Sequence, residues 1–134
     1  MDRFKTQKPN LFHYVTAVTY KRVPVFKSDH ACELLIETVR AVKGRDPFKL
    51  IGYVIMPDHL HLLVNPLSMN ISELMRQIKG ASARRILDWL KQSGYTPSLE
   101  KLRLDSPQKR GHTYAVWQKD FSAIDIWSEK FIQQ

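Results

Sequence analysis

The sequence predicts an α+β fold, because three features give one order of elements. Runs rich in aromatic and β-branched residues predict strands at 12–20, 48–56, 59–65 and 113–121. Apolar residues at helical spacing predict helices at 29–43, from 71 onward and at 124–134. Only a short turn separates the second strand from the third. The order β-α-β-β-α-β-α suits a ferredoxin-like antiparallel sheet with helices packed on one face.

Length and composition indicate a single domain spanning residues 1–134. No apolar run approaches the roughly 20 residues that span a bilayer, and the amino terminus lacks a signal-peptide core, so no membrane partner is expected. The single cysteine, Cys32, excludes an intramolecular disulfide. A cytoplasmic location is therefore expected.

The formal charge of +8 indicates an anionic partner, with nucleic acid favoured over a membrane surface. Between Arg76 and Arg110 there are nine Lys or Arg residues and only three Asp or Glu residues. Most of the excess charge therefore lies in the second half of the chain.

Individual residues indicate where the first strand ends and where the first helix begins and ends. Pro24 argues against a central strand after the first run. Ser28 or Asp29 can cap a helix that runs to about Lys43, and Gly44 is expected to end it.

The hairpin between residues 48 and 65 carries the most specific chemistry. Pro57-Asp58 is a turn, and the strand that follows begins His59-Leu60-His61. Side chains alternate along a strand, so His59 and His61 share a face, with their backbones roughly 6–7 Å apart, and can converge on one divalent metal. Two such histidines can also be a surface patch or satisfied core groups. The otherwise apolar strand favours a ligand or a hydrogen-bond network, because burying bare imidazole is costly.

The second helix opens with a capping box, Asn70 followed three residues later by Glu73. Its apolar stripe leaves four cations on other faces: Arg76, Lys79, Arg84 and Arg85. A DNA-contacting face and a merely solvated face both fit these cations. A bend is expected at Gly80.

The remainder of the chain is less regular. Residues 94–112 form a long loop with a short helical turn expected at 98–104, and Lys109-Arg110 can hold phosphates. In the strand at 113–121, Tyr114, Val116 and Gln118 share a face. The last helix has Ile124, Trp127 and Phe131 in register.

The block Met56-Pro57-Asp58-His59-Leu60-His61-Leu62-Leu63 resembles the signature of the HUH single-tyrosine transposases, the insertion-sequence and REP-associated enzymes. Weaker similarity extends to the opening strand, His13 to Phe26, and to the second helix, Leu74 to Ile86. The resemblance implies cutting and rejoining of single-stranded DNA with hairpin-forming ends, in a homodimer. It also implies a Mg²⁺ or Mn²⁺ ion held by His59 and His61, with Gln133, Gln134 or His13 as third-ligand candidates.

The resemblance further implies a tyrosine nucleophile that forms a 5′-phosphotyrosine link. In that family the tyrosine lies on the last helix, but residues 127–134 contain none. The tyrosine is expected within about one turn past Gln134, and the fallback candidates are Tyr114 and Tyr95. Two interpretations stay open: the natural chain continues, or the protein is an inactive relative.

Two other classes of function compete with this one. A non-catalytic single-stranded nucleic-acid-binding protein on the same fold would use the basic helix and loop residues with aromatic platforms. A metal-dependent hydrolase of small phosphoesters is disfavoured by the positive charge and by the lack of a further clustered carboxylate or histidine.

Overall fold

The computed structural model describes residues 11–106 and 112–126. The sheet consists of β1 (Phe12–Val18), β2 (Lys49–Met56), β3 (His59–Asn65) and β4 (Ser122–Ile126). The helices are α1 (Asp29–Arg45), α2 (Ile71–Gln92) and α3 (Thr96–Glu100), with single turns η2 (Tyr20–Arg22) and η3 (Val25–Lys27) after β1. The strand order is β2-β3-β1-β4, and all neighbours are antiparallel. This arrangement confirms the predicted ferredoxin-like fold.

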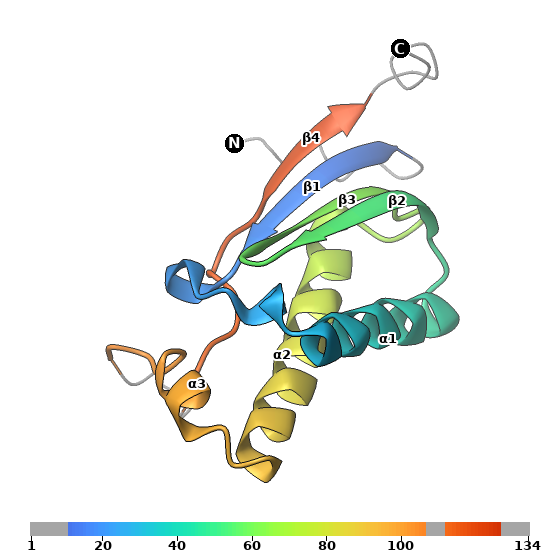
Figure 1. The fold of residues 1–134 in the computed structure, drawn as a ribbon. Helices are drawn as coiled ribbons and strands as arrows, with labels where there is room; N and C mark the ends of the chain where they lie inside the picture. Colours follow the sequence, from blue (N-terminus) through green and yellow to red (C-terminus); the bar gives the residue numbers. More distant parts are fainter. Residues whose placement is uncertain (1–10, 107–111, 127–134) are drawn as a thin grey trace.

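Helices α1 and α2 cover the same face of the sheet, as Figure 1 shows. Leu60, Leu62 and Val64 of β3 are buried against this layer together with the apolar stripes of both helices. His59, His61 and Leu63 of β3 are only partly buried, because no described element covers the opposite face. Among the described residues, no helix is both long and apolar enough to cross a bilayer.

Both predicted helix starts are confirmed by their caps. The Ser28 hydroxyl accepts a hydrogen bond from the Ala31 amide at 3.2 Å. The Asn70 side chain accepts one from the Glu73 amide at 2.8 Å. The ends were less well predicted: α1 continues through Gly44 to Arg45, and α2 passes Gly80 without a break, because burial of each apolar stripe outweighs the weak helix propensity of one glycine.

The predicted strand at 113–121 is wrong. This segment makes only isolated bridges, Thr19 with Trp117 and Arg103 with Tyr114. Its adjacent residues Val116 and Trp117 are both buried, so the alternation that a strand of the sheet requires is absent. Strand propensity reflects packing context, and here the aromatic segment fills the core beside α2.

The fourth strand instead begins at Ser122 and pairs with β1, so Ile124 lies opposite Tyr14. The predicted helix from Ile124 is therefore wrong at its start, and residues 127–134 lie outside the described residues. The helical turn expected at 98–104 is α3, two residues earlier at its start.

Candidate metal and DNA site

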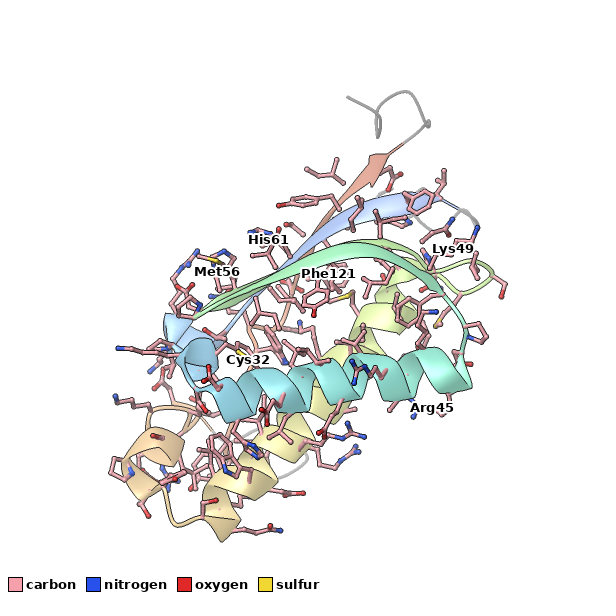
Figure 2. All side chains as sticks on the ribbon, turned by 45° about the vertical axis from the view of Figure 1, so that its right-hand side comes forward. Cys32, Arg45, Lys49, Met56, His61 and Phe121 are labelled. Carbon is pink, nitrogen blue, oxygen red and sulfur yellow. The ribbon has the colours of Figure 1, made fainter. Side chains whose placement is uncertain are left out.

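His59 and His61 lie on the face of the sheet that α1 and α2 leave open, and Figure 2 shows His61 there. Their ring centroids are 4.7 Å apart, and the ring planes meet at 78°. The residue between them, Leu60, is buried on the covered face. Strand alternation therefore brings the two imidazoles together, as the sequence predicted.

One nitrogen of each ring is already engaged. Nδ1 of His59 lies 2.7 Å from Asp58 Oδ1, and Nδ1 of His61 lies 3.0 Å from Thr16 Oγ1. Among the described residues, nothing is hydrogen-bonded to either Nε2 atom. When Nδ1 carries the proton and donates it to an outer partner, Nε2 presents a lone pair, which is the usual arrangement of metal-binding histidines.

The local electrostatics shift the pKa values of His61 and Asp58. Partial burial, and secondarily the neighbouring His59, lowers the pKa of His61 and favours its neutral form. The pKa of Asp58 is lowered mainly by its hydrogen bond with His59 and then by its hydrogen bond with Arg22. A neutral imidazole can bind a divalent cation, and an ionised carboxylate can orient a neighbouring imidazole from outside the metal's ligand shell.

Asp58 is held by a strained turn that follows β1. Arg22 Nη1 donates to Asp58 Oδ2 at 2.9 Å, while the Thr19 amide and hydroxyl donate to the Asp58 carbonyl at 2.9 and 3.1 Å. The turn includes two non-glycine residues with left-handed φ, Lys21 at 51° and Arg22 at 54°. Such strain persists only where surrounding contacts over-determine it, and it is common at functional sites.

Sequence reasoning missed most of the supporting residues. Thr16 and Tyr14 could have been found from the alternation of β1, which puts both on the open face; the Tyr14 ring stacks on His61 with centroids 5.4 Å apart. The surrounding face is apolar: exposed fractions are 40% for Tyr14, 52% for Val54, 40% for Met56 and 61% for Ile124. Met56 pairs with His59 on the neighbouring strand β2, and Figure 2 labels both Met56 and His61.

His13, a third-ligand candidate, lies on the opposite face from the histidine pair. It is fully buried and pairs with Val64, and its Nδ1 approaches Asp125 Oδ1 to 3.0 Å. The other candidates, Gln133 and Gln134, lie outside the described residues. Within residues 11–106 and 112–126 there is no cluster of three or more His, Cys, Asp or Glu side chains suited to a metal. The described part of the chain therefore offers two ligands.

The fallback tyrosines also lie elsewhere. The Tyr114 hydroxyl is 3.2 Å from Arg103 Nη2 and 3.4 Å from Glu100 Oε2, beside α3. Tyr95 precedes α3, and its ring contacts Trp89. The structure brings neither residue to the histidine pair.

Residues 7–99 match the family described as IS200-like transposases. The chain belongs to this family. The match includes β1, the hairpin and all of α2, so the assignment made from the Met56–Leu63 block is confirmed. No curated protein matches the sequence significantly.

Two solved structures share the fold of this member of the family. One is a REP-associated tyrosine transposase bound to a REP hairpin, with a TM-score of 0.64 and 18% identity over 95% of this chain. The chain spans 62% of the length of that protein. The other is a candidate transposase from Deinococcus radiodurans, with a TM-score of 0.61, 22% identity, and coverage of 92% of this chain and 84% of that one.

The four cations of α2 that were predicted to contact DNA differ in their surroundings. Lys79 Nζ donates to the carbonyls of Gln118 at 2.8 Å and Lys119 at 2.9 Å, so it secures the segment before β4. Arg85 donates to Thr38 Oγ1 of α1 at 3.3 Å. Both side chains therefore have partners inside the fold.

Arg76 and Arg84 remain exposed. Arg76 makes two hydrogen bonds to Glu73, whereas Arg84 has no ion-pair or hydrogen-bond partner among the described residues. Together with Arg45 at the end of α1, they line a polar cleft of about 360 Å³. Arg45 was missed because it ends the first helix, far from the basic window. Lys109 and Arg110 lie outside the described residues.

Proposed function

We propose that this transposase cuts and rejoins single-stranded DNA with hairpin-forming ends, at a divalent-cation site made by His59 and His61. The observation that carries the proposal is the arrangement of the two rings: each Nδ1 has a partner, and neither Nε2 has one among the described residues. Mg²⁺ or Mn²⁺ bound there supplies positive charge that polarises a phosphodiester.

The remaining chemistry belongs to the protein and the DNA. A tyrosine hydroxyl, expected beyond Gln134, attacks phosphorus; a P–O bond to the DNA breaks, leaving a 5′-phosphotyrosine and a free 3′-hydroxyl. A DNA 3′-hydroxyl then attacks the phosphotyrosine and releases the tyrosine. Each step exchanges one phosphodiester for another, so no external energy source is required. Asp58 and Thr16 orient the histidines, and a homodimer is the expected assembly.

The first test is metal binding by the chain as it stands. Titration with Mn²⁺ should show uptake that His59→Ala or His61→Ala abolishes, whereas His30→Ala, an exposed histidine on α1, should leave it unchanged. If both variants take up as much Mn²⁺ as the unaltered chain, the metal site is refuted. That result would favour the alternative of a non-catalytic single-stranded nucleic-acid-binding protein.

The second test is strand cleavage. A chain extended through the next tyrosine is incubated with hairpin-bearing single-stranded DNA and Mn²⁺, and covalent protein–DNA adducts are separated under denaturing conditions. The proposal expects an adduct that His59→Ala removes. Absence of any adduct from a chain that binds both Mn²⁺ and the DNA would contradict the enzymatic function.

A further inference from the structure

A second cavity lies away from the histidine pair, between η3, the end of α2 and α3. Its volume is about 420 Å³, within the range of small-ligand sites. Val23, Pro24 and Val25 form one wall, and Trp89 and Tyr95 contribute aromatic rings. None of the functions considered above uses it.

The aromatic wall is formed by rings that pack against one another. The Trp89 ring is flanked by His30 at 4.8 Å and by Tyr95 at 5.7 Å, both at steep interplanar angles. Gly94, with a φ of +72°, makes the turn that returns Tyr95 to the end of α2, where its amide donates to the Leu90 carbonyl at 3.1 Å. Tyr95 is nevertheless 50% exposed, so part of its ring is available to a ligand.

The charges of the cavity favour an anion. Its lining includes Lys27 and Lys101 and contains no carboxylate. A flat aromatic surface beside two ammonium groups matches a nucleotide, which combines a base with a π-face and a phosphate. A peptide without acidic side chains could pack against the rings, but it would leave Lys27 and Lys101 without a counter-charge.

The cavity is also connected to the histidine site through the chain. Val23, in its wall, directly follows Arg22, which donates to Asp58, the hydrogen-bond partner of His59. The Phe26 amide of η3 donates to the Pro57 carbonyl at 2.9 Å, so this wall is fixed to the turn that carries Asp58. The cavity wall and two residues that donate to Pro57 and Asp58 therefore belong to one segment of the chain, residues 22–26.

We propose that this cavity binds an unpaired nucleotide of the DNA strand, with the base against Tyr95 and Trp89 and the phosphate against Lys27 and Lys101. The inference rests on the proposed function in taking single-stranded DNA as the substrate. It adds a base-binding site that does not depend on the metal.

The experiment measures binding of fluorescein-labelled oligothymidylate, about eight nucleotides long, to the full chain in EDTA by fluorescence anisotropy. Tyr95→Ala should weaken binding by about fivefold to a hundredfold, since one stacked base is lost. Tyr95→Trp should restore it. The matched control is Tyr53→Ala, since Tyr53 is equally exposed at 50% but lies on β2 outside this cavity. It should bind like the unaltered chain.

Two further measurements identify the base and the phosphate. An oligomer of abasic deoxyribose phosphates should bind more weakly and should be insensitive to Tyr95→Ala. Lys101→Gln should lower the slope of log affinity against log salt by about 0.7, as expected for one lost phosphate contact on a single strand. Lys49→Gln, at an exposed position on β2, is the control.

The proposal is overturned if Tyr95→Ala and Tyr53→Ala behave alike, or if Tyr95→Ala weakens abasic and thymidylate oligomers equally. Both comparisons are made without metal, so they are independent of the Mn²⁺ titration. If Mn²⁺ uptake does not depend on His59 but oligonucleotide binding does depend on Tyr95, only the proposed metal site is refuted. If Mn²⁺ uptake depends on His59 but oligonucleotide binding does not depend on Tyr95, only the nucleotide cavity is refuted.

Discussion

The hydroxyl of Thr16 gives a direct test of how the sheet prepares His61 for a cation. Thr16→Val keeps the branched shape and removes the group 3.0 Å from His61 Nδ1. A neutral hydrogen bond contributes about 1 kcal/mol net, which corresponds to roughly a fivefold change in affinity. Because His61 is only partly buried, water replaces part of that bond, so Mn²⁺ affinity should fall by about twofold to fivefold.

The assay is isothermal titration of Mn²⁺ into the unaltered chain, Thr16→Val and Thr16→Ser at one pH. Serine retains the hydroxyl and should bind the ion nearly as tightly as threonine. Unfolding in urea should show that the valine variant is folded under the assay conditions. Equal affinities for the valine and serine variants, with His61→Ala still impaired, would refute the argument that Thr16 orients the ring.

Four other outcomes follow from the structure. Asp58→Asn should weaken Mn²⁺ binding about tenfold to a hundredfold by calorimetry, more than Thr16→Val, because its bond to His59 is charge-assisted. Hydrogen bonds from Arg76 and Gln77 lower the pKa of Glu73 from 4.5 to about 2. The folded-state pKa is depressed, so Glu73→Gln should cost under about 1 kcal/mol of unfolding free energy at neutral pH, and urea titrations should show the difference fading as the pH falls from 4.5 towards 2. Lys79→Met should cost about 1–2 kcal/mol in the same assay, because charged hydrogen bonds to backbone carbonyls are lost. Arg84→Met should be stable but should lower the salt slope of hairpin-DNA binding by about one, measured by anisotropy.

The histidine hairpin could be predicted from sequence because its determinants are local. A proline turn, strand alternation and an apolar partner face act within a dozen residues, so the bounds of β3 and the shared face of His59 and His61 were correct. The caps at Ser28 and Asn70 were predictable for the same reason.

The structure of residues 113–126 could not be predicted from local patterns. Its aromatic segment has strand composition, but Trp117 donates its indole N–H to Ser82 of α2 at 3.0 Å and is buried beside it. The strand that follows has helical spacing at Ile124, yet it pairs with β1. Both outcomes depend on contacts between residues far apart in sequence, which no local pattern encodes.

The partners of the histidines illustrate the same limit. Thr16 is 45 residues from His61, and Arg22 is 36 residues from Asp58. The sequence identifies Asp58 only as a turn residue. Its place between Arg22 and His59 depends on the pairing of the strands.

Because the backbone at Lys21 and Arg22 is left-handed, the proposed metal site can form only when the domain is fully folded. Neither residue type prefers that conformation, so the bend has no local reason to form. It exists because β1 is already paired with β3 and Asp58 is in place to receive three hydrogen bonds. In a chain that has collapsed without closing its sheet, the imidazoles would lack these outer partners. Cation affinity can therefore report on completed folding during refolding experiments.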